Sequence, residues 1–341
     1  MNGKDGILAV VKPKTKFSLV ATDLDGTFLG ENPEGSKKPN MPTKDNVEVF
    51  RKLDADGVPL AMISGRSYAT TSVMMDYCAL DQYVISCHGA IIFGPKGGGA
   101  DRAIVKSWPV TADLQEAAAA AAVATDTLVM MYTADGIVSA GRVDDNLTFP
   151  NLRGEPIGSW WARVGEFPIQ SEGHPAFEAL APELKDLVKS SPLFPNSRHF
   201  EAWEDLLAHV RAAELNVYKV LLVARPARIP DVLAKARDQI PPELGNVMGP
   251  FESWVEIIHP DVNKAVAVHH LADTIGSSLA ECVTFGDGLN DVEMLRQAGL
   301  GVAMANAVPE AREAAAYVST FSNEESAVAH ELGRLVVSGL L

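Results

Sequence analysis

Strand-like and helix-like segments alternate at both ends of this 341-residue chain, and this alternation constrains the fold more than any other feature. Residues 17–24, FSLVATDL, are short and apolar, as buried parallel strands are. The next regular element resembles a helix. Thr43 is its N-cap candidate, and Gly57 is its stop signal. Two more strands, VPLAMIS and QYVISC, follow with a helix between them. The pattern predicts an α/β fold with a doubly wound parallel sheet.

The middle of the chain has a different pattern. It contains an alanine-rich helix, a hairpin signal at Asp135-Gly136 between two apolar strands, and further strand-like and helical segments. The regular alternation resumes near residue 259. We therefore expect residues 16–94 and 259–341 to form a Rossmann-like core. Residues 95–258 are expected to form an inserted α+β domain with a small antiparallel sheet of its own.

Charge and composition exclude several classes of partner. The net charge of −15, from 44 acidic and 29 basic residues, argues against non-specific binding of nucleic acid or of an anionic membrane, because both need basic patches. No segment approaches the roughly 20 apolar residues of a membrane span, and the N-terminal apolar run is too short for a signal peptide. Three cysteines without a CxxC motif indicate reduced thiols. We expect a cytoplasmic monomer or homodimer without a nucleic-acid or membrane partner.

The first candidate site follows the first strand, where Asp23 and Asp25 stand two residues apart. Ligands bind at the carboxyl ends of the strands in an open parallel sheet. At about 6 Å and an effective dielectric constant of about 20, two carboxylates repel by roughly 3 kcal/mol. A divalent cation would turn this repulsion into attraction, and one carboxylate could then attack a substrate while the other moves a proton. The alternative for this motif alone is a turn after a strand.

Two other segments could bind an anion at the same edge of the sheet. Ser64-Gly65-Arg66 follows the second strand, and its hydroxyl and backbone N–H groups suit a phosphoryl oxygen, although Ser64 could instead be the N-cap of the next helix. Lys264 stands at a helix start, where the helix dipole disfavours a cation. The Lys264 side chain is therefore either held by anions or directed into solvent.

A fourth segment, GDGLNDVEML, places Asp287, Asn290 and Asp291 directly after another strand. Gly286 and Gly288 allow the backbone to approach a ligand closely. A carboxylate such as Asp287 suits a hard cation. The alternative is that these acidic and amide side chains only cap the following helix.

Taken together, DLDGT, SGR, Lys264 and GDGLNDVEML resemble the motifs of haloacid dehalogenase-superfamily phosphatases. The motifs cover both ends of the chain, about half of its length. The size and position of the insertion resemble the cap of the Cof-like branch, and VEIIHPDVNK resembles the segment that leaves this cap. The resemblance implies a catalytic core with an α+β cap, Mg²⁺ as cofactor and a small phosphorylated metabolite as substrate.

The resemblance also implies the roles of single residues. Asp23 would be the nucleophile that takes the phosphoryl group, and Asp25 would protonate the leaving oxygen and later activate water. Mg²⁺ would be held by the Asp23 carboxylate, the Asp25 backbone carbonyl and the Asp287 carboxylate. Asp291 would complete the metal site and orient Lys264.

Phosphate binding would involve Ser64, Gly65, Asn290 and Lys264. The chain departs from the family pattern at His88, in SCHGAII, where this branch usually has asparagine. His88 is a candidate substrate contact near the junction of cap and core, and the alternative is a hydrogen-bonded structural histidine. In the insertion, tryptophans and arginines are weaker candidates for substrate contacts: Arg142, Arg153, Trp160, Trp161 and Arg198.

We therefore predict Mg²⁺-dependent hydrolysis of a small phosphomonoester, with sugar phosphates as the first class to consider, through an aspartyl-phosphate. One alternative is a phosphomutase or phosphotransferase of the same superfamily, which a requirement for a bisphosphate activator would favour. Another is a non-catalytic sensor of a phosphorylated metabolite, which binding without turnover would favour.

Overall fold

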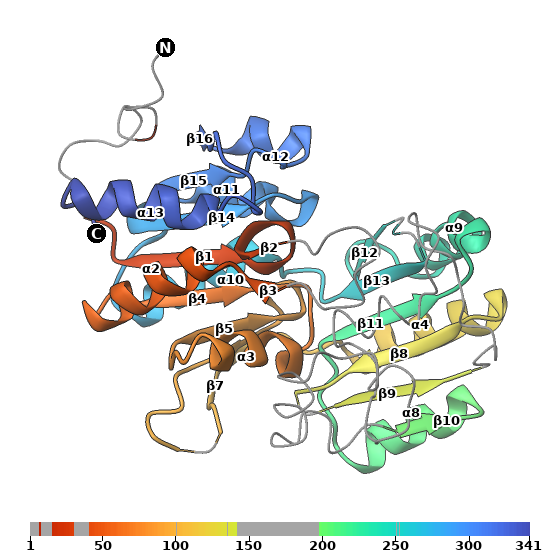
Figure 1. Cartoon of the computed structure of the whole chain (residues 1–341). Coiled ribbons are helices and arrows are strands. Elements are labelled where there is room, and N and C mark those ends of the chain that lie inside the picture. Colours follow the sequence, from red (N-terminus) through yellow and green to blue (C-terminus); the bar gives the residue numbers. More distant parts are fainter. Residues whose placement is uncertain are drawn as a thin grey trace.

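The structure is a computed structural model of the chain (Figure 1). It describes residues 7, 16–30, 41–99, 101–134, 136–141, 198–249, 251 and 253–341. These residues form two sheets flanked by helices and a short two-stranded ribbon of β2 (Leu29–Gly30) and β3 (Met41–Pro42). Within these ranges, none of the helices combines the length and the apolar character that a bilayer crossing requires.

The larger sheet has eight strands in the order β16-β15-β14-β1-β4-β5-β6-β7. The pairs from β16 to β5 are parallel, whereas β5–β6 and β6–β7 are antiparallel. The bounds are β1 (Leu19–Asp23), β4 (Leu60–Ile63), β5 (Tyr83–Ser86), β6 (Ile91–Phe93), β7 (Ile104–Ser107), β14 (Cys282–Gly286), β15 (Leu300–Ala303) and β16 (Tyr317–Val318). The predicted parallel sheet is confirmed, and β1 lies inside it.

Helices cover both faces of this sheet because successive side chains of a strand point to opposite faces. Val20 of β1 belongs to one core cluster with Phe50 and Leu332. The next residue, Ala21, belongs to a second cluster with Val268. The bounds of the helices are α2 (Lys44–Ala55), α3 (Tyr68–Tyr77), α10 (Lys264–Thr274), α11 (Val292–Gln297), α12 (Pro309–Ala314) and α13 (Ala327–Val337).

Side-chain caps fix where the helices after β1 and β4 begin. Thr43 caps α2, as predicted. Ser67 caps α3, and its hydroxyl accepts a hydrogen bond from the N–H of Thr70. Ser64 lies three residues earlier, and its Oγ accepts from the N–H of Arg66 at 3.2 Å. The alternative reading of Ser64 as the N-cap is therefore wrong, because a closer serine takes that position.

The smaller sheet has six strands in the order β10-β9-β8-β11-β13-β12. Its pairs are antiparallel except for β9–β10, which is parallel. The bounds of its strands and helices are α4 (Ala112–Thr125), β8 (Leu128–Tyr132), β9 (Ile137–Ala140), β10 (Arg198–Phe200), α8 (Trp203–Ala212), β11 (Lys219–Val223), α9 (Ile229–Gln239), β12 (Asn246–Met248) and β13 (Trp254–Ile258). The expectation of a purely antiparallel sheet is therefore wrong at the β10 edge, where β9 and β10 are parallel. Residues 141–197 separate β9 from β10, and a connection of that length allows a parallel return.

The two faces of the smaller sheet have different neighbours. Val129, Val220 and Val255 pack with α4, α8 and α9 in one cluster. Side chains of the opposite face, such as Tyr132 and Leu221, belong instead to the cluster of the larger sheet. This face therefore packs toward the larger sheet.

Strand β7 corrects the expected start of the insertion at residue 95. It pairs with β6 in the larger sheet. The strand is short, and its side chains are exposed or half-buried, so the sequence carries no strong strand signal there. The last strand of the larger sheet before the smaller sheet ends at Ser107, and α10 is the first helix after the smaller sheet that packs on the larger one. We call the described residues from 108 to 258 the insert.

Candidate active site

Three neighbouring strands of the larger sheet end at the predicted site. Strand β1 lies between β4 and β14 and pairs with both in parallel, so their carboxyl ends meet at one edge. Asp23 is the last residue of β1, Ser64 follows β4, and Asp287 follows β14. This edge is where open parallel sheets bind ligands.

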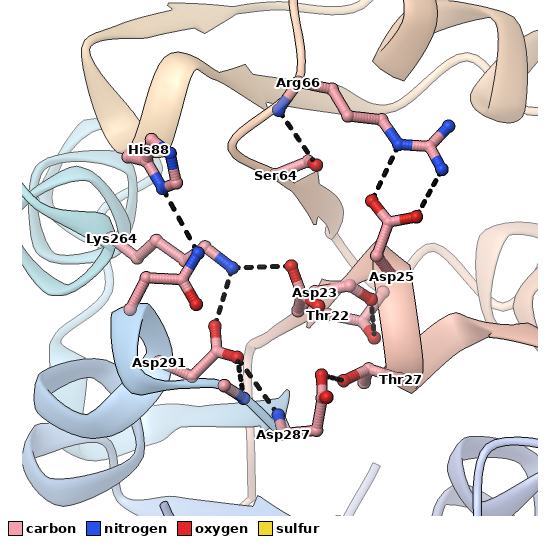
Figure 2. A network of polar contacts seen from close by, with 12 residues as sticks. Thr22, Asp23, Asp25, Thr27, Ser64, Arg66, His88, Lys264, Asp287 and Asp291 are labelled. Atoms are coloured by element: carbon pink, nitrogen blue, oxygen red, sulfur yellow. Dashed lines mark hydrogen bonds and ion pairs between the residues drawn. The ribbon is translucent and has the colours of Figure 1, made fainter. Parts of the chain in front are cut away.

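The carboxylates of Asp23, Asp287 and Asp291 form an acidic cluster at this edge (Figure 2). Each offers an oxygen that lies within 4.8 Å of the others. Thr27 Oγ1 donates to Asp287 Oδ1 at 2.7 Å. Asp291 Oδ2 accepts from the backbone N–H groups of Asp287 and Gly288, at 3.0 and 2.9 Å. These hydrogen bonds orient two of the three carboxylates.

Gly26 allows the first loop to lie against the acidic cluster. Its φ of +76° is in the left-handed region that favours glycine. A Cβ atom at this position would also overlap the carboxylate of Asp287. Backbone conformation and close approach therefore both require glycine.

Lys264 lies against the acidic cluster as the first residue of α10, with a side chain that is 0% exposed. Its Nζ donates to Asp23 Oδ1 at 2.5 Å and to Asp291 Oδ1 at 2.7 Å. The sequence left open whether the Lys264 side chain is held by anions or directed into solvent. The structure shows that anions hold it.

The electrostatics of the cluster show an excess of negative charge. Burial raises the pKa of Asp23 well above its ordinary value; Lys264 opposes this rise, and the neighbouring carboxylates add to it. Burial and the Asp291 carboxylate raise the pKa of Asp287 to about 6. Burial alone would lower the pKa of Lys264, but Asp23 and Asp291 raise it above its ordinary value.

The donor set of the acidic cluster fits a hard divalent cation. Its donor atoms are carboxylate oxygens, which Mg²⁺ prefers. The cluster contains three carboxylates and the ammonium of Lys264, which bonds to two of them, so a dication would balance the remaining charge.

Asp25 lies beside this cluster, but its carboxylate points toward Arg66 (Figure 2). Arg66 Nε donates to Asp25 Oδ2 at 2.7 Å, and a terminal guanidinium nitrogen donates to Oδ1. The Arg66 side chain is 5% exposed and that of Asp25 is 44% exposed. In the sequence, nothing marked Arg66 as a functional residue beyond its place in Ser64-Gly65-Arg66.

His88 contacts the predicted phosphate-binding residues. Its backbone N–H donates to the carbonyl of Ser64 at 3.0 Å, and a Cβ on Gly65 would overlap its imidazole. Its Nδ1 lies 3.2 Å from Nδ2 of Asn290, and its Nε2 lies 2.5 Å from Oε2 of Glu256 in the insert. The sequence carried no signal for Glu256.

The predicted residues thus fall into groups. The carboxylates of Asp23, Asp287 and Asp291 lie together with the ammonium of Lys264, and Asn290 lies beside His88. The carboxylate of Asp25 lies apart from that cluster, on Arg66. Arg198 is exposed on β10. Four of the candidates in the insertion lie outside the described residues: Arg142, Arg153, Trp160 and Trp161.

Comparison with known proteins gives a consistent result. The sequence model of the haloacid dehalogenase-like hydrolases matches residues 20–332. The HMP-PP phosphatase of Cronobacter sakazakii is 25% identical over 295 residues, which cover 86% of this chain and 85% of that protein. A haloacid dehalogenase-like hydrolase from Bacteroides thetaiotaomicron has a similar structure, with a TM-score of 0.67, 19% identity and coverage of 94% of this chain and 100% of that one. A sugar phosphatase of subclass IIB has a TM-score of 0.63 and 16% identity, and covers 95% of this chain and 100% of its own. Because the family match spans most of the sequence, the chain belongs to the haloacid dehalogenase-like hydrolases.

Proposed function

We propose that this chain is a Mg²⁺-dependent phosphomonoester hydrolase that acts on a small phosphorylated metabolite through an aspartyl-phosphate intermediate. The observation that carries the proposal is the pair of bonds from Lys264 to Asp23 and Asp291, with Asp287 in the same cluster. Asp23, a carboxylate at a strand end, thus bonds to an ammonium and lies beside two further carboxylates. Phosphoryl transfer depends on this kind of positioning and charge balance.

Asp23, Asp287 and the backbone carbonyl of Asp25 would hold Mg²⁺, with Asp291 supporting the site. Bound Mg²⁺ would offset the charge of the phosphoryl oxygens and favour the ionised carboxylates. The raised pKa values of Asp23 and Asp287 support this assignment, because each marks a carboxylate that lacks enough positive charge nearby.

Asp23 is the proposed nucleophile. Its Oδ1 bonds to Lys264, so Oδ2 is the oxygen that attacks the phosphorus atom. The new Asp23–phosphorus bond forms while the bond from phosphorus to the leaving oxygen breaks. Water then attacks the phosphorus atom, which releases inorganic phosphate and restores the carboxylate.

Asp25 is the proposed acid and base. It would give a proton to the leaving oxygen and later accept one from the attacking water. Its carboxylate bonds to Arg66 here, so this role requires the side chain to turn toward Asp23. The partial exposure of Asp25 supports such a movement.

The phosphoryl oxygens would be bound by Lys264, the Ser64 hydroxyl, the Gly65 backbone N–H and the Asn290 amide. The insert reaches these phosphate-binding residues through Glu256, which bonds to His88. An inserted domain that contacts the site in this way favours a small substrate, and sugar phosphates, the class of one protein with this fold, are tested first.

The test is phosphate release from p-nitrophenyl phosphate and a panel of sugar phosphates, with Mg²⁺ and with excess EDTA. We expect release that EDTA abolishes and added Mg²⁺ restores. The matched variants are Asp23→Asn, which should be inactive, and Asp56→Asn, in an exposed pair with Lys52, which should retain full activity. Folded protein that releases no phosphate from any compound, or releases it equally in EDTA, would contradict the proposal.

A further inference from the structure

A buried chain of polar contacts connects the insert to the proposed phosphate-binding residues. Lys219 of β11 lies 3.4 Å from Oε1 of Glu256 on β13. The other oxygen of Glu256 lies 2.5 Å from Nε2 of His88, and Nδ1 of His88 lies 3.2 Å from the amide nitrogen of Asn290. The side chains of Lys219, Glu256 and His88 are 1%, 8% and 6% exposed, so water does not screen these contacts strongly.

The partners of His88 determine where its proton lies. The ionised carboxylate of Glu256 can only accept, so Nε2 of His88 carries a proton and donates it to Glu256. In the neutral ring Nδ1 is then an acceptor, which suits the Asn290 amide nitrogen that lies 3.2 Å from it. Burial alone would raise the pKa of Glu256, but Lys219 and the hydrogen bond from His88 lower it below its ordinary value, which keeps this acceptor ionised. Glu256 thus fixes the tautomer of His88, and His88 in turn fixes which end of the Asn290 amide faces it.

Lys219 makes a second contact with the proposed phosphate-binding loop. Its Nζ donates to the carbonyl oxygen of Gly65 at 2.5 Å and lies 4.3 Å from the centre of the Tyr132 ring. The peptide of Gly65 is therefore held from the insert. Because Gly65 also packs against the imidazole of His88, both contacts act on one group of residues.

The backbone around His88 is strained in a way that supports a functional role. Cys87 and His88 have φ values of +52° and +58°, which non-glycine residues rarely adopt. Two hydrogen bonds hold this segment to the loop after β4. The N–H of Cys87 donates to the carbonyl oxygen of Arg66 at 2.9 Å, and the N–H of His88 donates to the carbonyl oxygen of Ser64 at 3.0 Å. Strain of this kind persists where the surrounding structure over-determines the conformation, often at functional sites.

We propose that Glu256 and Lys219 are positioning residues for phosphoryl transfer: Glu256 orients the Asn290 amide through His88, and Lys219 fixes the Gly65 peptide. This inference rests on the proposed function, because Asn290 and Gly65 matter only if they bind a phosphoryl group. It assigns the insert a part in holding the transferred group itself, in addition to covering the substrate.

Two double variants separate positioning from stability. Lys219→Met/Glu256→Leu removes both buried charges and the hydrogen bond to His88, whereas Lys219→Met/Glu256→Gln removes the charges and keeps an acceptor for His88. Replacing both partners avoids an unpaired buried charge, so both variants should fold. We expect kcat for p-nitrophenyl phosphate to fall at least tenfold further in the Leu variant than in the Gln variant, with KM values within threefold. Glu116→Gln, in an exposed pair with Arg211, is the control that should match the wild type.

A spectroscopic readout tests the contacts independently of turnover. In protein labelled with ¹⁵N-histidine, the His88 signal, assigned by its loss in His88→Asn, should show a proton on Nε2 and none on Nδ1. The Leu variant should lose this state, and the Gln variant should keep it.

The outcomes separate the two proposals. A proton on Nδ1 of His88 in the wild type, equal kcat values in the two double variants, or a kcat of the Gln variant equal to that of the wild type although it lacks Lys219, would overturn the inference and leave the phosphatase assignment intact. A wild type that releases no phosphate from the whole panel would overturn the proposed function, and this inference with it.

Discussion

Replacing Lys264 by methionine is the perturbation whose effect the structure determines most directly. The substitution keeps the volume of the side chain and removes an ammonium that lies 2.5 Å from Asp23 and 2.7 Å from Asp291. At an effective dielectric constant of about 20, each pair attracts by roughly 6 kcal/mol before desolvation is subtracted. Desolvation of the buried ions offsets much of this attraction. Loss of one partner of a buried ion pair costs about 3–5 kcal/mol, which is the loss of unfolding free energy that we expect without metal.

The loss of activity should be larger than stability alone explains. Removing one preorganised donor near a developing charge typically lowers kcat by about 10²–10³. Lys264 also favours the ionised form of Asp23, so the variant would have a nucleophile that is more often protonated. Excess Mg²⁺ should restore much of the lost stability, because the ion balances charge, but it should not restore kcat, because it does not replace the hydrogen bond to Asp23.

The assay combines urea unfolding, with Mg²⁺ and with EDTA, with turnover of p-nitrophenyl phosphate. Lys235→Met, in an exposed pair with Asp238 on α9, is the matched control and should change neither quantity. A Lys264→Met variant with kcat within tenfold of the wild type, and with an unfolding free energy within about 1 kcal/mol of it, would refute the reasoning.

Three other predictions test the acidic cluster. Asp23→Asn should abolish phosphate release and leave the far-ultraviolet circular dichroism spectrum unchanged; activity within tenfold of the wild type would contradict its role as nucleophile. The pKa of Asp287 is raised from 3.8 to about 6, so the folded state binds more protons than the unfolded state in this window. In EDTA, unfolding free energy should therefore fall as pH rises from 3.8 to about 6, and Asp287→Asn should lose this component; identical pH profiles of the two proteins would count against it. Gly26→Ala should raise the Mg²⁺ concentration for half-maximal activity at least tenfold because its Cβ overlaps Asp287, whereas Gly57→Ala, with a φ of +77° and open space around it, should change stability alone. An equal effect of both glycine variants on the Mg²⁺ requirement would show that backbone strain, and not the overlap, is responsible.

The sequence determined by itself the parallel strands of the larger sheet and which loops carry acidic side chains. Buried strands and capped helices are specified by side chains a few residues apart, as at Thr43, so their pattern can be read locally. Since parallel strands end at a common edge, the acidic loops after β1 and β14 could be expected to meet there. The position of β7 could not be read in the same way, because a short edge strand with exposed side chains lacks a distinct apolar pattern.

Tertiary structure alone decided which side chains pair with one another across the chain. Arg66 bonds to Asp25, 41 residues away, and Glu256 bonds to His88, 168 residues away. No local pattern specifies such partners, because they are selected when separate elements pack and buried charges must find compensating groups. Local propensity therefore determined the strands and loops of this protein, whereas long-range packing decided how the insert meets the edge of the larger sheet and what each ionised side chain there contacts.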